Sequence, residues 1–228
     1  MQEKIYTIPV NEAFEQTDEC PFCVMYEKLE FNEIELITGA SMMSPDVRIK
    51  TNKLGFCSDH IHKMYDKNLR LPLALTLQTH LAEIKNDISL GGFFSKDISA
   101  KPIKRIEELN ETCYVCGRIE EQFSKMLNTA CYLYDKEQEF RDKFNSQTRF
   151  CLPHYAMILK TCKTVVSKRW LEQFIKDSDK ILNDYLTSLY DDISLFCKKF
   201  DYNYKDTPWG NAKDSVDRTI KFLCTMNK

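Results

Sequence analysis

Glycine is scarce in this chain, with 6 residues in 228. Soluble domains average about 7% glycine, so a sheet protein built from many tight glycine turns is disfavoured. The six glycines form none of the phosphate-binding loops or nucleophile elbows of common enzymes, and no H-E-x-x-H motif occurs. The sequence therefore gives no sign of a catalytic constellation.

Long hydrophobic runs and an excess of one charge are also missing. The stretch LPLALTL at 71–77 is too short to span a bilayer, and the first residues lack a basic segment followed by an apolar run. With 32 basic and 34 acidic residues the formal net charge is −2, which gives no bulk attraction to nucleic acid or to an anionic membrane. We therefore expect a cytoplasmic protein without membrane association, whose 43% apolar residues form a buried core.

Helical periodicity dominates the chain, and no stretch shows sustained strand alternation. Residues 1–10 are expected to be extended and residues 41–55 to form a loop. The prediction is an all-α fold. A long amphipathic helix of about 30 residues is expected over 171–200, with a break at 177–179 left open. The other helices are expected over 23–37, 58–67, 71–88, 103–109, 118–134 and 137–144, from Pro153 onward and after Asn211.

The segment SLGGFFSKDISAKP at 89–102 is the best candidate for an internal boundary. It contains two adjacent glycines and a proline, which interrupt regular structure. We expect one family-type domain made of two lobes, the first over 1–95 and the second over 96–228 with a C-terminal extension.

Cysteine is abundant, with ten residues, and six of them form four short motifs with two histidines. C-x2-C occurs at 20–23 and 113–116, and C-x2-H occurs at 57–60 and 151–154. The gap between the paired motifs is 33 residues in the first half and 34 in the second. Matched spacing of this kind indicates an internal duplication of about 94 residues.

Each motif is suited to hold one side of a metal ion. Ligands at i and i+3 in a first helical turn point the same way, so each motif supplies one edge of a tetrahedron. Three thiolates with one imidazole suit zinc best, and an iron-sulfur centre is a less favoured alternative. Four protein ligands leave no open position, which is typical of structural zinc. Taken in sequence order, the ligand sets are Cys20, Cys23, Cys57 and His60, then Cys113, Cys116, Cys151 and His154.

The remaining histidines and cysteines are expected to carry no chemistry. His62 lies two residues beyond His60 and points elsewhere on a helix, and His80 is expected to be a partly buried helix residue. The other four cysteines lack a partner motif, and we expect small buried side chains at Cys131, Cys162, Cys197 and Cys224.

Two alternative functions stay open. A proline between two cysteines also marks thioredoxin-like redox sites, so Cys20 and Cys23 could serve a thiol redox or metal-stress enzyme, although no strand precedes them. The basic run around Trp170, over 160–169, could contact nucleic acid, but a solvated helix face fits the balanced charge better. The aromatic segment 200–209 is expected to belong to a terminal strap on the core.

Segments along the whole chain, including DECPFC at 18–23, FCLPH at 150–154 and FDYNYKDTPWGNAKD at 200–214, resemble a bacterial family of uncharacterised proteins. The family is a domain of unknown function with twin C-P-x-C and F-C-x-x-H elements. The resemblance implies that its presumed metal ligands fall on the eight residues named above, and it implies no activity.

The sequence thus predicts an all-α protein of two pseudo-repeated lobes, each held by a Cys3His zinc site, with a long C-terminal amphipathic helix and a terminal strap. Two zinc ions per chain and a non-enzymatic binding or regulatory role are expected. The partner is unidentified. A protein partner is compatible with this role, whereas nucleic acid and membrane are not favoured.

Overall fold

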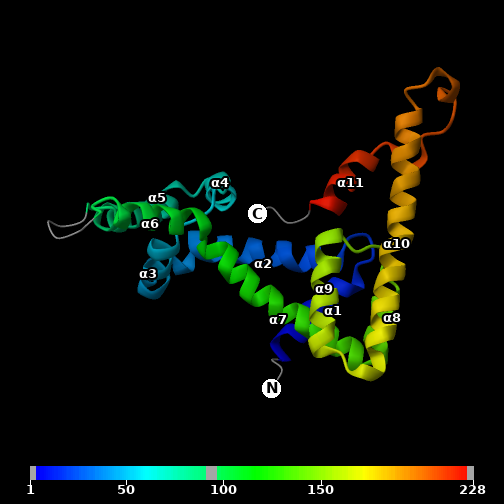
Figure 1. Cartoon of the computed structure of the whole chain (residues 1–228), viewed down its shortest axis with the longest axis horizontal. Helices are drawn as coiled ribbons and strands as arrows, with labels where there is room; N and C mark the ends of the chain where they lie inside the picture. Colours follow the sequence, from blue (N-terminus) through cyan, green and yellow to red (C-terminus); the bar gives the residue numbers. More distant parts are fainter. Residues whose placement is uncertain (1–3, 91–96, 225–228) are drawn as a thin grey trace. The chain divides into compact units, whose positions relative to one another are not determined.

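A computed structural model describes residues 4–90 and 97–224 of the chain. These residues form eleven α-helices and four short 3-10 helices, without a strand among them (Figure 1). No helix in this part of the chain is both long enough and apolar enough to cross a membrane. The all-α prediction is confirmed. The α-helices are α1 Thr7–Glu15, α2 Pro21–Thr38, α3 Pro45–Leu54, α4 Ser58–Asp66, α5 Arg70–Asp87, α6 Ala100–Glu111, α7 Tyr114–Lys136, α8 Gln138–Asn145, α9 Leu152–Val165, α10 Lys168–Lys198 and α11 Ser215–Leu223.

Backbone contacts divide the chain into two units. The first unit comprises Met1–Glu27 with Phe123–Lys228, and the second comprises Lys28–Gln122. The boundaries between the units fall inside α2 and α7, so they do not coincide with the expected division at residue 95. The glycine pair of that expected boundary lies in 91–96, outside the described residues. That the two halves are duplicated lobes stays a prediction.

An aromatic cluster forms the core of the first unit. Phe144 of α8 is completely buried and lies at the centre of this cluster. The ring centroid of Phe144 is 5.7 Å from that of Phe14, 5.0 Å from Tyr134, 5.3 Å from Phe150 and 5.1 Å from Phe174. These rings come from α1, α7, α10 and the residue before the C-x2-H motif, so the cluster joins distant parts of the sequence.

The extended conformation expected for residues 1–10 is wrong for residues 4–10, where a 3-10 helix over Lys4–Tyr6 is followed by α1 from Thr7, and residues 1–3 lie outside the described residues. Pro9 lies in the first turn of this helix, where the missing amide hydrogen would have no helical partner. Burial of Val10 and Phe14 against the first unit supplies the stabilisation that local propensity lacks.

The loop expected over 41–55 is also wrong, because most of it forms α3. Pro45 occupies the first position of this helix, where proline is favoured, and Gly55 ends it. In the second unit α3 packs on α5, and Arg105 of α6 links both by donating to Asp87 at 2.7 Å and to the carbonyl oxygen of Lys53 at 2.8 Å.

Gly55 connects α3 to the C-x2-H motif at 57–60 in a backbone conformation with φ +63° and ψ −159°. Only glycine adopts this region readily, and an added Cβ would approach the His80 ring nitrogen Nε2 to 3.1 Å. We expect Gly55→Ala to lower the free energy of unfolding by about 1–3 kcal/mol in denaturant titrations.

Gly117→Ala is the matched control for this prediction. Gly117 is exposed in α7, and an added Cβ there meets nothing within 4 Å. Alanine is favoured over glycine in a helix by about 0.5–1 kcal/mol, so this variant is expected to gain stability. Equal effects of the two substitutions would contradict the strained conformation assigned to Gly55.

The long C-terminal helix α10 runs unbroken through 177–179, and Ser178 there is buried with its hydroxyl donating to the carbonyl oxygen of Phe174 at 2.7 Å. The chain then folds back, and Phe222 of α11 packs against Leu182 and Leu189 of α10. This return segment is a terminal strap, but α11 forms it and not the aromatic residues at 200–209.

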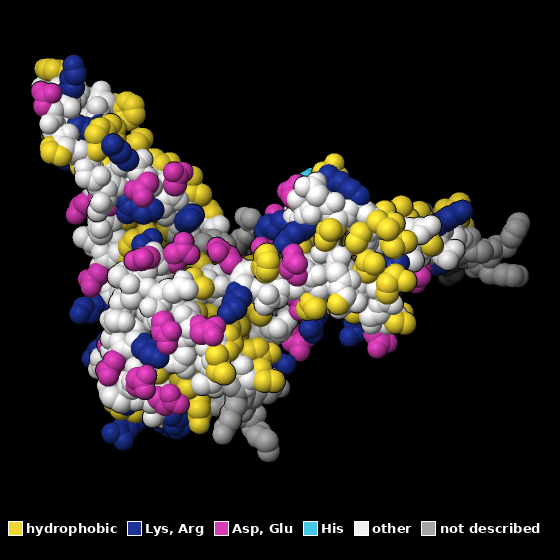
Figure 2. Space-filling view, turned by 180° about the vertical axis from the view of Figure 1, so that it is seen from behind, with side chains coloured by type: hydrophobic (Ala, Val, Ile, Leu, Met, Phe, Trp, Pro, Cys, Tyr) yellow, Lys and Arg dark blue, Asp and Glu magenta, His cyan; other side chains and the backbone are white. Residues whose placement is uncertain are grey.

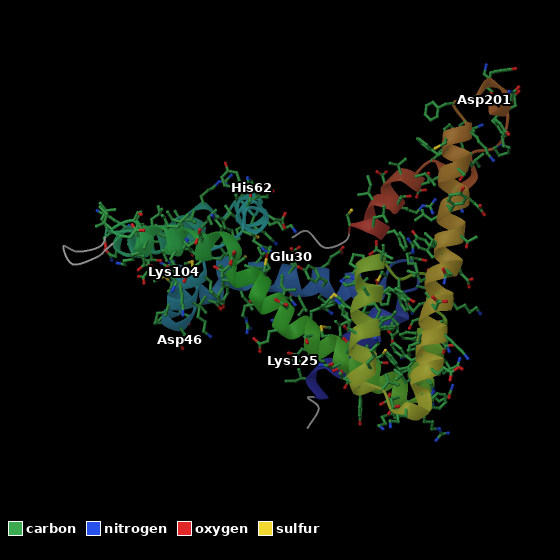
Figure 3. The ribbon with its side chains drawn as sticks, viewed as in Figure 1. Glu30, Asp46, His62, Lys104, Lys125 and Asp201 are labelled. Atoms are coloured by element: carbon green, nitrogen blue, oxygen red, sulfur yellow. The ribbon has the colours of Figure 1, made fainter. Side chains whose placement is uncertain are left out.

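The aromatic residues at 200–209 do not pack on the core. Phe200 is 79% exposed and Tyr202 is 86% exposed. Among the described aromatic pairs, Trp209 contacts only Phe196 near the end of α10, with the two ring centroids 6.0 Å apart. Hydrophobic side chains are visible at this end of α10, at the upper left of Figure 2. Asp201, labelled in Figure 3, is the second residue of this segment, and its side chain accepts a hydrogen bond from the backbone amide of Asn203.

Candidate metal centres

All four cysteine motifs lie at helix N-termini. The C-x2-C motifs open α2 and α7, and the C-x2-H motifs open α4 and α9 with their cysteines as N-caps. The positive end of the helix dipole favours a thiolate at this position. The two-residue spacing therefore places both ligands of each motif in or beside one helical turn.

The first cluster contains Cys20, Cys23, Cys151 and His154, and all four are buried. The sulfur of Cys23 lies 3.6 Å from that of Cys151 and 3.4 Å from Nδ1 of His154. The sulfur of Cys151 lies 3.0 Å from the same nitrogen. All four residues belong to the first unit.

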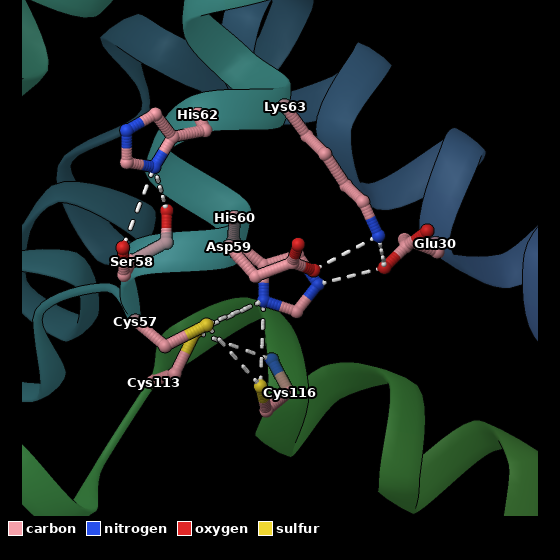
Figure 4. Close-up of polar contacts among 9 residues, drawn as sticks. All are labelled: Glu30, Cys57, Ser58, Asp59, His60, His62, Lys63, Cys113 and Cys116. Carbon is pink, nitrogen blue, oxygen red and sulfur yellow. Dashed lines mark hydrogen bonds and ion pairs between the residues drawn. The ribbon is translucent and has the colours of Figure 1, made fainter. Parts of the chain in front are cut away.

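The second cluster contains Cys57, His60, Cys113 and Cys116 in the second unit (Figure 4). Nδ1 of His60 lies 3.1 Å from the sulfur of Cys57, 3.4 Å from that of Cys113 and 3.3 Å from that of Cys116. Here Cys57 and Cys116 are partly exposed, in contrast to the first cluster.

The spacing of these atoms matches a tetrahedral metal site. With metal–sulfur bonds of about 2.3 Å and metal–nitrogen bonds of about 2.0 Å, a tetrahedron has sulfur–sulfur edges of about 3.8 Å and sulfur–nitrogen edges of about 3.5 Å. The sulfur–sulfur distances of 3.6 and 3.9 Å agree with the first value. Sulfur–nitrogen distances of 3.0 to 3.4 Å are slightly shorter, and both clusters fit one metal ion each.

The grouping of ligands in sequence order is wrong. Each C-x2-C motif shares a cluster with the C-x2-H motif of the other half of the chain. The physical reason is the helix that follows each C-x2-C motif. At a rise of 1.5 Å per residue, α2 carries the chain away from Cys20 and Cys23 before it reaches Cys57, and α7 does the same after Cys116.

In each cluster, burial and neighbouring thiols raise the pKa of at least one cysteine. Burial raises the pKa of Cys20 to about 12, and contact with Cys151 raises the pKa of Cys23 above its ordinary range. Burial, the largest single effect, opposes ionisation of Cys113 as well, but the hydrogen bond and charge of His60 together with backbone hydrogen bonds from Cys116 and Cys57 outweigh it and lower the pKa of this thiol to about 6. Three adjacent thiolates therefore require a cation among them.

Glu30 of α2 lies beside the second cluster, although no sequence motif indicated it. Its carboxylate accepts from Nε2 of His60 at 3.1 Å and from Lys63 at 2.8 Å, and Lys63 also contacts Asp59 at 2.9 Å (Figure 4). A carboxylate in this position fixes the ring so that Nδ1 faces the three sulfurs. Glu30 is on α2 and His60 is on α4, so only the tertiary fold brings the two side chains together. No local sequence motif marks Glu30.

We expect Glu30→Ala to weaken metal binding at the second cluster by about 10- to 100-fold while leaving the first cluster unchanged. Cadmium-113 NMR of cadmium-loaded protein, titrated with a chelator, reports each cluster by its own resonance. Glu35→Ala is the control, because Glu35 lies on the same helix and pairs with Lys67 away from the cluster. Equal weakening at both clusters would contradict the positioning role of Glu30.

His154 of the first cluster has a different environment. Its Nε2 atom is buried without a hydrogen-bond partner among the described residues, and the rings of Phe123, Phe22 and Tyr26 lie at centroid distances of 5.1, 6.2 and 6.2 Å. Aromatic packing therefore holds this imidazole where a carboxylate holds the other. The two clusters share a donor set but not their surroundings.

The remaining histidines lie outside both clusters. His62 on α4 is exposed, with Nδ1 near Ser58, and points away from the sulfurs (Figures 3 and 4). His80 is partly buried, and its Nδ1 lies 2.9 Å from the carbonyl oxygen of Asn52. His80 is thus the partly buried helix residue that the sequence predicts.

Of the four remaining cysteines, which were all expected to be buried, two are buried and two are exposed. Cys131 and Cys162 are buried apolar residues, as expected. Cys197 and Cys224 are exposed because they lie near the ends of α10 and α11, where little packs against them. None of the four joins a metal cluster among the described residues.

The basic run at 160–169 is built around Trp170. The guanidinium groups of Arg141 and Arg169 lie over its ring at 4.2 and 5.3 Å, so part of the charge in this region is used within the fold. Lys160 and Lys163 are exposed on α9.

The fold and the clusters define an all-helical protein with two clusters that could each hold a metal ion, each made of three cysteines and one histidine. The model of the family of unknown function DUF6062 matches residues 1–228, and the chain belongs to this family. Searches among curated proteins and among solved structures gave no match. The expected membership in an uncharacterised family is confirmed.

Proposed function

We propose that the chain binds two zinc ions, one in each cluster, and that these ions stabilise its helical units. The observation that supports this most strongly is that two complete sets of three sulfurs and one imidazole nitrogen come together from four separate motifs. Sulfur and imidazole donors without a carboxylate suit zinc, and Mg²⁺, Ca²⁺ and Mn²⁺ prefer oxygen.

The role proposed for both ions is structural. Four protein ligands complete a tetrahedral zinc site and leave no position for a reacting water molecule. The protein is then a binding or regulatory module whose surfaces the metal sites hold in place. Exposed apolar side chains are visible on the second unit in Figure 2. They fit a protein partner better than nucleic acid. The exposed apolar residues of this unit include Leu71, Leu81, Ile103 and Ile106.

The redox alternative has less support. A thioredoxin-like dithiol needs an accessible nucleophilic cysteine with a lowered pKa. Cys20 and Cys23 are instead buried beside Cys151 and His154, and burial raises the pKa of Cys20. As metal ligands, these thiols are expected to react slowly and only after a chelator removes the ion.

We also propose that the two halves of the chain arose by duplication and that the protein is cytoplasmic. In both halves of the chain a C-x2-C motif opens a long helix and a C-x2-H motif opens a shorter one, as expected of two copies of one ancestral unit. Metal-binding thiols persist in a reducing compartment, which supports a cytoplasmic location.

Elemental analysis of the purified protein tests the proposal. The expected result is about two zinc ions per chain, and removal of both ions by a chelator is expected to unfold the helices as seen by circular dichroism. Refolding with zinc, and not with magnesium, should restore the signal. A fully folded protein without metal, or one that contains iron in place of zinc, would overturn the proposal.

A further inference from the structure

A cavity of about 280 Å³ in the first unit lies beside the first cluster. Its walls include Cys20, Cys23 and Cys151, together with Arg149 and Tyr185. The sulfurs of the first cluster therefore share a space with charged side chains.

Arg149 is a half-buried cation of this cavity that has no carboxylate partner among the described residues. Its guanidinium lies 5.0 Å from the Tyr185 ring centroid and contacts the Tyr185 hydroxyl at 3.5 Å. Its Nε atom is buried without a hydrogen bond. A half-buried guanidinium without an anion is costly, so its position calls for a negative charge nearby.

The first cluster supplies such a charge. Three thiolates around one divalent ion leave a net charge of about −1, and this charge is buried. The Nε2 atom of His154 is buried without a hydrogen-bond partner among the described residues, so no cation contacts the ring there to offset the charge.

We propose that Arg149 is the counter-cation of the first metal site and strengthens metal binding there by electrostatic stabilisation of the three thiolates. The inference rests on the metal binding proposed above. Arg149 is then a positioning and tuning residue, since it bonds to none of the sulfurs directly. Tyr185 of α10 holds its guanidinium in the wall of the cavity.

The other charges of the cavity do not take this role. Arg218 is already paired with Asp192 at 2.9 Å and Asp214 at 3.0 Å. Lys221 is exposed, so water screens it, and the carboxylates of Glu19 and Glu27 are also exposed. Arg149 is therefore the half-buried cation whose charge acts on the cluster.

The test compares metal affinity at the two clusters in the full chain. Cadmium-113 NMR with chelator competition separates the clusters, and the second cluster is the internal reference. Arg149→Gln is expected to weaken binding at the first cluster about tenfold or more, and to shift its cadmium resonance, with no change at the second. Arg149→Lys keeps the charge and is expected to restore most of the affinity.

Arg169→Gln is the matched control, because Arg169 is an exposed arginine of the same unit with Trp170 as its aromatic contact. It is expected to leave both clusters unchanged. Unchanged affinity in Arg149→Gln, equal weakening at both clusters, or failure of lysine to restore binding would each overturn the proposal. Wild-type protein that binds no metal would instead refute the metal sites themselves.

Discussion

Replacing Cys151 by serine is expected to remove one zinc ion per chain and to lower the free energy of unfolding by at least about 3 kcal/mol. The sulfur of Cys151 lies within 3.6 Å of Cys23 and 3.0 Å of His154, so it is a central ligand of the first cluster. A serine hydroxyl stays protonated and does not replace a thiolate. The measurement is metal content together with denaturant unfolding in excess zinc.

Cys162→Ser is the matched control for this variant. Cys162 lies on the same helix, α9, and is completely buried, but it belongs to neither cluster. Its substitution costs packing and is expected to leave two zinc ions bound. If Cys151→Ser also retained two ions, Cys151 would not be a ligand.

Phe144→Ala is expected to lower the free energy of unfolding by about 3–5 kcal/mol, because it leaves a large cavity in the core. Phe144 is completely buried, and its ring contacts four other aromatic rings of the first unit. Its buried area is lost on truncation, and so are its ring contacts, which include stacking on Phe14 and an edge-to-face contact with Tyr134. Urea or guanidinium titration of the zinc-loaded protein measures this loss.

Phe200→Ala provides the comparison for the core substitution. Phe200 is 79% exposed, so its truncation is expected to change stability by less than about 0.5 kcal/mol. A loss below about 1 kcal/mol for Phe144→Ala would show that the aromatic cluster is not the core of this unit.

The sequence was sufficient to identify the eight clustered residues and most of the helices. Spacing of cysteine and histidine is a local property, and so is the apolar period that marks α7 and α10. Thr7 and Pro45 begin helices that local signals did not reveal. Helix α1 depends on the burial of Phe14 in a distant aromatic cluster, and α3 depends on its packing against α5.

Pairing of the motifs could not be predicted from spacing alone. Cys57 and Cys151 each begin a C-x2-H motif, one in each half of the chain. The sequence pattern is equally compatible with either motif joining Cys20 and Cys23. Helix direction decides the outcome, and direction is a tertiary property. The contact of Glu30 with His60 was missed for the same reason, since 30 residues separate them.

Native mass spectrometry of two double variants tests the central claim most directly, because it counts the metal ions bound to each chain. Cys20→Ser with Cys151→Ser removes two ligands of one cluster and is expected to retain one zinc ion. Cys20→Ser with Cys57→Ser damages both clusters and is expected to retain none. The reverse pattern, with one ion kept in the second variant and none in the first, would contradict the crossed pairing of the two halves.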